Sequence, residues 1–451
     1  MNIIIVGCGK VGVTLAEQLH NEGHSITLID KDAARLRKVT DHVDVMGMEG
    51  NGLSYEVQIE AGITEANLLI ATTHSDEQNM LCCLIAKKAG NCHTIARVRN
   101  PEYVKEVRYI REELNMSMVI NPELAAASEI ARLVKFPSAI KIDSFAKGRI
   151  EMMKFVIPEK SDLSGLPLSQ VNVKLHCNVL ICAVERGDDV VIPDGNFVLM
   201  AGDKVSFIGK HKQALDFFKK ANVTVNQTKS VMLIGGGKIA YYLAKALEDT
   251  GISIKIIEHS FEKCQELSEL LSKAMIIHGD GTDQDLLLEE GIENTDVVAS
   301  LTGFDEENIM LSLYASSLSN TKLVTKINRI GFESVIKKMN LGSIINPKLI
   351  TADSIVSYVR AMQNSMGSNV ETVYKIVAGK AEALEFRVGM EPKIVGIPLQ
   401  KLTLKAGLLV ACINRNGKII TPNGQDTIER GDTVVIVTTQ TGLNDLKDIL
   451  A

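Results

Sequence analysis

The sequence predicts an α/β protein with two doubly wound parallel sheets, each followed by a small β-rich α+β domain. A glycine-rich turn, Gly7-x-Gly9-x-x-Gly12, follows an apolar run, and Asp30 ends the next apolar run. The same unit recurs as Gly235-x-Gly237-x-x-Ala240 with Glu258. Both separations are 228 residues (235 − 7 and 258 − 30). A unit repeated at fixed spacing indicates a duplicated architecture.

Composition limits the kind of protein. At 451 residues the chain is long enough for three or four domains. With 45% hydrophobic and 23% charged residues, it has the composition of a soluble globular protein rather than a disordered one. A net charge of −6, few aromatic residues and no Trp argue against nucleic acid as a partner.

The sequence also predicts a cytosolic location. It passes from Met1-Asn2 directly into an apolar strand, so it shows no signal-peptide pattern. No apolar run approaches the roughly 18 residues of a membrane-spanning helix. The eight cysteines show no C-x-x-C spacing and are expected to be reduced, mostly buried thiols.

In the first repeat, short apolar runs alternate with helical patterns. The predicted strands are 3–6, 25–29, 43–46, 68–72 and 94–98. The predicted helices are 12–22, 33–40, 55–61, 76–89 and 101–114. Continuous branched apolar runs are typical of parallel strands covered on both faces, so each glycine turn belongs to a Rossmann-like sheet.

A helix follows each predicted sheet. In the first half it begins near Pro122 and ends before Pro137, and its apolar stripe needs a partner outside the completed sheet. We therefore expect a crossover helix that packs against a second domain or subunit. Beyond it, short strands separated by Gly- and Asp-containing turns indicate a small β-rich domain, and the polar stretch 224–229 is the expected linker.

The predicted division of the chain repeats this order. The ranges are 1–122 and 229–347 for the two nucleotide-binding domains, 123–138 and 348–366 for the crossover helices, and 139–223 and 367–451 for the small domains.

The glycines fit a phosphate-binding turn. The first permits the tight turn, the second lets a pyrophosphate approach the backbone, and the third permits close helix–strand packing. Phosphates would meet free N–H groups at the positive end of the following helix, and Lys10 adds a cation. The loop candidates of the first half are Gly7, Cys8, Gly9, Lys10, Val11 and Gly12.

Asp30 is the expected partner of both ribose hydroxyls of an adenosine. A 2′-phosphate there would be repelled by about 4 kcal/mol at 4 Å and an effective dielectric near 20, so NADP is disfavoured. Glu258 has the same role in the second half, where His259 beside it weakens the exclusion. A structural turn that has lost its ligand is the alternative for the second loop, and the first site is expected to bind better.

Further candidates follow the carboxyl ends of the strands, where ligands bind in such sheets. In the first half they are Lys31, Gly50, Asn51, Thr72, Thr73 and Arg97. In the second half the candidates are Gly235, Gly237, Lys238, Ile239, Glu258, Asp280, Gly281 and Thr302.

Other polar residues have simpler explanations. Asp76 and Asp305 begin helices and are interpreted as N-caps beside the positive dipole. Glu123 could join a divalent-cation site between subunits, although its place at a helix start explains it without a metal, and Lys348 replaces it in the second half. The sequence predicts no metal site and no catalytic residue.

Several segments together resemble the TrkA family of Trk-system potassium uptake proteins, which have duplicated regulator-of-potassium-conductance (RCK) domains. The resemblance covers essentially the full length and departs most at Ala240 and Glu258. Its carriers are Val6-Gly7-Cys8-Gly9-Lys10-Val11-Gly12 with Asp30, Ala71-Thr72-Thr73 with Asp76-Glu77-Gln78-Asn79-Met80, Ile95-Ala96-Arg97-Val98-Arg99-Asn100-Pro101, and the repeated turns of the small domains.

The resemblance implies a gating subunit that forms a ring of four chains at the inner face of the cell membrane, beneath an integral-membrane potassium-translocating partner. It also implies NAD(H) as ligand, with ATP and ADP as alternatives. Potassium itself follows only from the resemblance.

Two other functions compete with a regulatory role. An NAD-dependent dehydrogenase would need a general acid or base at the nicotinamide and a substrate pocket, and no segment outside the duplicated framework supplies them. A small domain that senses another ligand, such as a cyclic dinucleotide, is a third, weaker possibility.

Overall fold

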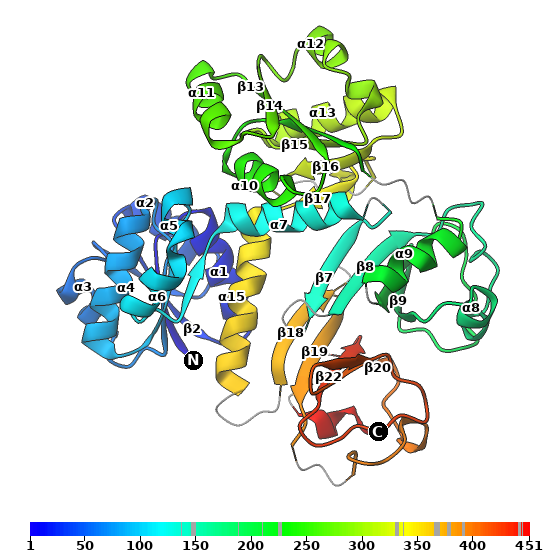
Figure 1. Cartoon of the computed structure of the whole chain (residues 1–451). Coiled ribbons are helices and arrows are strands. Elements are labelled where there is room, and N and C mark those ends of the chain that lie inside the picture. Colours follow the sequence, from blue (N-terminus) through cyan, green and yellow to red (C-terminus); the bar gives the residue numbers. More distant parts are fainter. Residues whose placement is uncertain are drawn as a thin grey trace.

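The computed structural model describes residues 1–451 except 137, 146–149, 188, 210, 224–227, 330–332, 337, 365–369, 377–379, 390–392, 441–442 and 444. Most of the expected linker 224–229 lies outside the described residues. Figure 1 shows two α/β domains and two smaller domains around a pair of long helices, α7 (Pro122–Lys135) and α15 (Pro347–Asn364).

The first α/β domain has a six-stranded parallel sheet in the order β3-β2-β1-β4-β5-β6. Its strands are β1 (Asn2–Val6), β2 (Ser25–Asp30), β3 (Met46–Glu49), β4 (Leu68–Ala71), β5 (His93–Arg97) and β6 (Met118–Ile120). Its helices are α1 (Lys10–Asn21), α2 (Ala33–Thr40), α3 (Tyr55–Glu60), α4 (Asp76–Gly90), α5 (Pro101–Lys105) and α6 (Val107–Glu113). The doubly wound fold is confirmed. The order in which successive strands are added to the sheet reverses between β1 and β4.

Two predicted elements of this domain were wrong in detail, and one strand was missed. The third strand occupies 46–49 instead of 43–46, because this edge strand pairs Thr27 with Met46 and is largely exposed, so apolar residues do not mark it. The predicted helix 101–114 divides at Glu106 into α5 and α6. A sixth, three-residue strand, β6, was too short to be recognised.

The second α/β domain repeats this topology in the order β14-β13-β12-β15-β16-β17. Its strands are β12 (Ser230–Ile234), β13 (Ser253–Glu258), β14 (Ala274–His278), β15 (Val297–Ser300), β16 (Lys322–Lys326) and β17 (Ser343–Ile345). Its helices are α10 (Lys238–Leu247), α11 (Phe261–Leu270), α12 (Gln284–Glu289), η1 (Ile292–Asn294), α13 (Asp305–Leu318) and α14 (Glu333–Ile336).

The two long helices exchange partners between the halves. Helix α7 leaves the first domain and packs against α10 of the second, where Ile130 and Val134 share a buried cluster with Leu243. Helix α15 packs against α1, and Ile355 and Val359 join the core of the first domain. Each half therefore completes its burial on the other half (Figure 1).

The first small domain is an antiparallel sheet, β10-β9-β11-β8-β7, with two helices. Its elements are β7 (Lys141–Phe145), β8 (Ile150–Val156), α8 (Leu168–Lys174), β9 (Leu180–Arg186), β10 (Asp189–Val191), β11 (Lys204–Gly209) and α9 (His211–Lys220). β7 and β8 were not predicted. The neighbouring Met152 and Met153 on β8 are both buried, on opposite faces, so no alternation of polar and apolar residues marks the strand.

The second small domain has the sheet β18-β19-β22-β20-β21. Its elements are β18 (Val370–Ile376), β19 (Ala381–Arg387), η3 (Leu399–Lys401), β20 (Leu408–Arg415), β21 (Lys418–Ile420), β22 (Thr433–Thr438) and η4 (Leu446–Ile449). The two small sheets share one buried cluster, in which Cys182 and Cys412 are both inaccessible to solvent. All eight cysteines are thiols rather than disulfides, and all but Cys177 are buried, as predicted.

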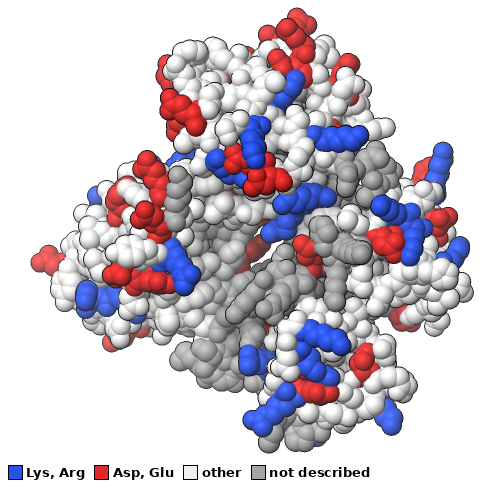
Figure 2. Space-filling view, in the orientation of Figure 1, with Lys and Arg blue, Asp and Glu red and all other residues white. Residues whose placement is uncertain are grey.

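Charged side chains of both signs are interspersed over the face shown in Figure 2, without a continuous field of one sign. In the part of the chain that the structure describes, no helix is long and apolar enough to cross a membrane.

A lysine of the second domain holds the C-terminal end of α7. The ammonium of Lys322, at the start of β16, donates to the carbonyl oxygen of the C-cap residue Phe136 at 3.1 Å and also to that of Ala139. A cation is favourable at this negative end of the helix. Burial nevertheless lowers the pKa of Lys322 to about 7.

Lys322 predicts a pH dependence of stability. In the unfolded chain its pKa is about 10.4. Between about pH 7 and pH 10 the unfolded state therefore binds more protons than the folded state, and the free energy of unfolding should rise with pH. Lys322→Met should reduce this rise, measured by chemical denaturation across that range. An equally steep rise in the variant would contradict the assignment.

Candidate nucleotide-binding site

The turn between β1 and α1 holds the three glycines of the first motif. Gly7 has a φ of +102°, which residues with side chains rarely adopt. A Cβ on Gly12 would lie 2.0 Å from the carbonyl oxygen of Gly7, so glycine is needed for α1 to start this close to the loop. A Cβ on Gly9 would meet no atom within 4 Å. Gly9 is the N-cap of α1 and makes no side-chain bond to the first N–H groups of the helix, which a ligand could therefore accept.

Asp30 is held beside this turn by the backbone. Its Oδ2 accepts the N–H of Cys8 at 2.6 Å, and its Oδ1 accepts the N–H of Asp32 at 2.9 Å. A carboxylate offers about four lone-pair positions, so capacity remains for ligand hydroxyls. The Cys8 side chain is buried, and burial together with Asp30 raises the pKa of its thiol to about 12, which keeps it protonated.

A cavity of about 380 Å³ opens over the carboxyl ends of β1, β2 and β4, where the chain reverses across the sheet. Its volume lies in the range of small-molecule sites. The sequence-predicted residues that line the cavity are Gly7, Gly9, Asp30, Lys31, Gly50, Asn51, Thr72, Thr73 and Arg97.

Four predicted loop residues do not line this cavity. Cys8 is buried behind the loop, and Gly12 packs against Gly7. Lys10 and Val11 line a different cavity, between the two halves. The sequence analysis missed several residues that line the cavity. They follow Asp30, Asn51 and Thr73 closely in the sequence, and this closeness could have identified them. They include Asp32, Arg35, Gly52, Leu53, His74 and Gln78.

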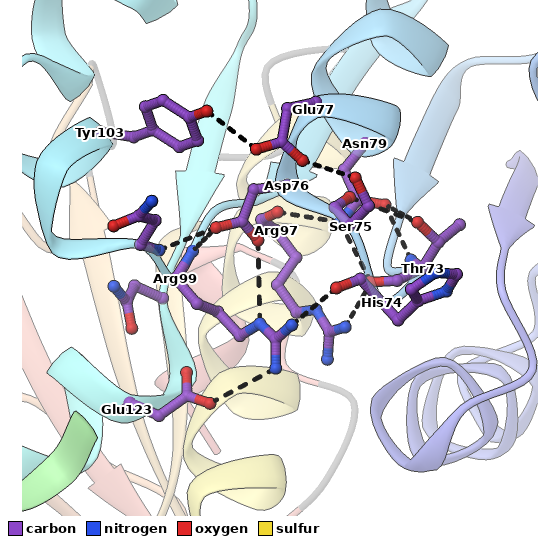
Figure 3. Close-up of polar contacts among 12 residues, drawn as sticks. Thr73, His74, Ser75, Asp76, Glu77, Asn79, Arg97, Arg99, Tyr103 and Glu123 are labelled. Atoms are coloured by element: carbon purple, nitrogen blue, oxygen red, sulfur yellow. Dashed lines mark hydrogen bonds and ion pairs between the residues drawn. The ribbon is translucent and has the colours of Figure 1, made fainter. Parts of the chain in front are cut away.

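A network of hydrogen bonds and ion pairs fixes the arginines at the rim of the cavity (Figure 3). Arg97 donates to the carbonyl oxygen of Thr73, and burial lowers the pKa of Arg97. Arg99 donates to the carbonyl oxygen of His74 at 2.7 Å and lies 3.7 Å from Asp76 and 3.9 Å from Glu123. We call residues 97–100 the arginine turn.

Asp76 organises the arginine turn instead of capping a helix. Its Oδ2 accepts the N–H groups of Arg99 and Asn100, each at 2.7 Å, whereas Ser75 caps α4 through the N–H of Gln78. The capping prediction was therefore wrong at this position. Asp305 repeats the arrangement by accepting the N–H groups of Asn328 and Arg329. The position of these two aspartates in the sequence could not reveal that each carboxylate also binds the backbone that follows a neighbouring strand.

The second glycine loop has the same backbone but different surroundings. Gly235 has a φ of +104°, and a Cβ on Gly237 would meet no atom within 4 Å. The Glu258 side chain is only 3% exposed and accepts the N–H groups of Gly236 and Ser260 at 2.7 and 2.9 Å. His259 Nδ1 lies 3.0 Å from the same carboxylate.

An additional carboxylate lies beside Thr302, which follows β15. The Thr302 hydroxyl donates to Glu307 at 3.0 Å, and Glu307 corresponds to Gln78 of the first half (307 − 78 = 229). A negative charge there would oppose a bound phosphate. Asp280 accepts the N–H and hydroxyl of Thr282, each at 2.8 Å, which lowers the pKa of Asp280.

Three residues of the second loop, Gly237, Lys238 and Ile239, line the cavity between the halves, which has a volume of about 310 Å³. The charged residues that line this cavity are mostly cations, with Glu123 as the one acidic lining residue in the described part of the chain. Its cations are Lys10, Arg97, Lys238, Lys326 and Lys348. Burial lowers the pKa of Lys326 and of Lys348, and for Lys348 the nearby Lys10 lowers it further.

Gly281, another predicted residue of the second half, has a role in packing. A Cβ on Gly281 would lie 2.4 Å from Ile234, so this glycine permits close packing over β12. Among the residues that the structure describes, no group of three or more His, Cys, Asp or Glu side chains could hold a metal ion.

Comparison with known proteins assigns the chain to a family. The TrkA-N domain model matches residues 3–122 and 231–347, and the TrkA-C domain model matches 152–222 and 383–451. The Trk system potassium uptake protein TrkA of Haemophilus influenzae is 32% identical over 456 residues, covering 100% of this chain and 97% of that protein. The chain belongs to the TrkA family. Its tandem TrkA-N and TrkA-C domains place it among the Trk-system potassium uptake proteins.

Other relatives support the same assignment of this TrkA-family chain. The Trk system potassium uptake protein TrkA homolog 1 of Methanosarcina mazei is 32% identical over 444 residues, which is 97% of each chain. The structure described as "GsuK channel bound to NAD" shares the fold, with a TM-score of 0.63 and 16% identity over 97% of this chain and 77% of that one. A GsuK structure described as bound to ADP has a TM-score of 0.50 and 15% identity over 79% of this chain and 69% of that one.

The glycine geometry predicts opposite effects at two neighbouring positions. Gly12→Ala forces a methyl group against the carbonyl oxygen of Gly7 and should lower the free energy of unfolding by about 1–3 kcal/mol. Gly9→Ala points into open space at an ordinary φ of −74° and should change it by no more than about 0.5 kcal/mol. Chemical denaturation of the ligand-free protein measures both. Equal losses would contradict the described packing.

Proposed function

We propose that this chain is a gating subunit that senses nucleotides, binding NAD(H) or the competing ligands ATP and ADP in the first cavity. The main support is the joint position of the open helix α1 N-terminus, Asp30 and Arg97 around one cavity. A pyrophosphate at Gly9 would meet free amides, and a ribose would meet Asp30. Arg97 lines both this cavity and the one between the halves, so the terminal phosphates of a ligand are its expected partner.

The ligand-binding residues follow from this proposal. In the first half we assign the contacts to the lining residues Gly7, Gly9, Asp30, Thr72, Thr73 and Arg97, with Lys31, Gly50 and Asn51 toward the adenosine. In the second half, the Glu258 side chain is only 3% exposed and Glu307 adds negative charge. We propose that the second site binds more weakly. The GsuK structures described as bound to NAD and to ADP support these ligand classes through the shared fold.

The proposed output is mechanical. We propose that the chain assembles as a ring of four copies at the inner face of the cell membrane and acts on an integral-membrane potassium-translocating partner. A ligand can shift the ring between conformations only if it binds them with different affinity. The cationic cavity between the halves offers such a difference, because ligand charge near it changes the repulsion among its lysines.

Nucleotide binding predicts a change in thermal stability. NADH, ATP or ADP at about 100 times its dissociation constant should add about 2.7 kcal/mol to the free energy of unfolding and raise the melting temperature. NADPH should have a smaller effect, because Asp30 repels the 2′-phosphate. Asp30→Ala should reduce the NADH shift, whereas Glu258→Gln should leave most of it. No shift with any of these nucleotides, or consumption of NADH with a carbonyl substrate, would contradict the proposal.

Assembly predicts a defined mass and a defined partner. Mass photometry of the purified chain should show a species of four copies. Membranes from cells that produce the potassium-translocating subunit should retain the chain in a sedimentation assay, and membranes from cells lacking that subunit should not. A monomer that binds both membranes equally would contradict the proposed partner.

A further inference from the structure

A tyrosine of the second half reaches across into the first. Tyr242 lies on α10, is 6% exposed, and donates its hydroxyl hydrogen to the carbonyl oxygen of Arg99 at 2.9 Å. The same hydroxyl accepts a hydrogen bond from Asn121 Nδ2 at 3.1 Å. Burial raises the pKa of Tyr242 to about 12, so the phenol remains a donor at neutral pH. One hydroxyl therefore joins the two halves through hydrogen bonds to two partners.

One partner belongs to the arginine turn, and the other begins α7. Arg99 is part of the arginine turn, which Asp76 holds through the N–H groups of Arg99 and Asn100 (Figure 3). Arg97, in the same turn, lines the first cavity. Asn121 is the N-cap of α7, and its Oδ1 accepts the N–H of Leu124 at 2.9 Å. A movement of the arginine turn would thus change the hydrogen bonds of Tyr242, including the one to Asn121 at the start of α7.

On its own side, Tyr242 lies about one helical turn beyond Lys238, the first residue of α10. Lys238 lines the cationic cavity together with Lys10 and Arg97. Helix α10 is also the surface on which α7 packs. The orientation of α10 therefore determines both the shape of the cavity between the halves and the contact with α7.

The duplication does not repeat this contact. The residue that corresponds to Tyr242 in the first half is Thr14 (242 − 228 = 14), whose hydroxyl donates to the carbonyl oxygen of Lys10 at 2.9 Å within its own helix. A threonine is too short to cross to the opposite half. The hydroxyl link is therefore a specialised feature of the second copy, in contrast to the duplicated framework around it.

We infer that Tyr242 is a positioning residue that couples the arginine turn beside the first cavity to the orientation of the second α/β domain. The inference rests on the proposed nucleotide binding at that cavity. A terminal phosphate that attracts Arg97 shifts the arginine turn, and the hydrogen bond from Tyr242 to Arg99 passes that shift to α10. The coupling works through the buried hydrogen bond between the Tyr242 hydroxyl and the carbonyl oxygen of Arg99. Both groups lose a hydrogen-bond partner when the arginine turn moves away, which costs free energy.

The test compares two neighbouring tyrosines. Tyr242→Phe removes the bridging hydroxyl and keeps the ring. Tyr241→Phe is the matched control, because Tyr241 is also buried on α10 and stacks edge-on against Tyr242 at 5.3 Å. Its hydroxyl makes no hydrogen bond within the described residues. Fluorophores at Glu60 and Glu266, two exposed positions on α3 and α11, report the separation of the two α/β domains by energy transfer.

The expected result is a ligand response that depends on one hydroxyl. In the unmodified chain and in Tyr241→Phe, saturating NADH or ATP should shift the energy-transfer signal. In Tyr242→Phe the ligand-induced change in the conformational equilibrium should fall by about threefold to tenfold, the size of one hydrogen bond. The thermal shift caused by the nucleotide should persist, which shows that the first site still binds.

The other outcomes of this experiment distinguish an error in the proposed function from an error in the role of Tyr242. If the unmodified chain shows neither a thermal shift nor an energy-transfer change, the proposed function is wrong. If it shows both and Tyr242→Phe responds equally, the coupling role of Tyr242 is wrong. An equal loss of the response in both tyrosine variants would show that the effect comes from the packing of the aromatic side chains. That result would also overturn the role of the Tyr242 hydroxyl.

Discussion

The structure depends on the burial of each crossover helix by the opposite half. The apolar stripe of α7 cannot be buried by the first sheet, which is already complete, so it packs on α10. The stripe of α15 packs on α1 for the same reason. This exchange places the two glycine loops on either side of one cationic cavity. The hydrogen bonds of Lys322 to the C-terminal end of α7 and of Tyr242 near its N-terminal end act on the same contact.

Duplication gave two similar backbones but unequal sites. The first loop needs glycine at position 12 to avoid its own carbonyl oxygen, whereas the second accommodates Ala240, which is fully buried. Both acids accept two backbone N–H groups, but Asp30 lines an open cavity, whereas the Glu258 side chain is only 3% exposed. Gln78 is replaced by Glu307, which changes the local charge by one unit. The asymmetry is electrostatic and steric, and it supports the proposal that the second site binds nucleotide more weakly.

The polar residues at the strand ends serve the interface as much as the ligand. Arg97 faces two cavities, and Arg99 links His74, Asp76 and Glu123 (Figure 3). Charges in a partly buried cluster are less screened by solvent than surface charges, so an anion bound beside them would interact with them more strongly.

The amino-acid sequence by itself determined the doubly wound sheets, the repeat and the lining residues Gly7, Gly9, Asp30 and Arg97, because glycine turns, apolar runs and strand-end acids are local signals. It could not place β8, which is buried on both faces, or the edge strand β3, which has little apolar pattern. Only the tertiary structure decided that Asp76 holds the arginine turn, that Lys10 faces the second half and that Tyr242 crosses to Arg99. These contacts join residues far apart in the chain, and their partners become neighbours only when the crossover helices pack.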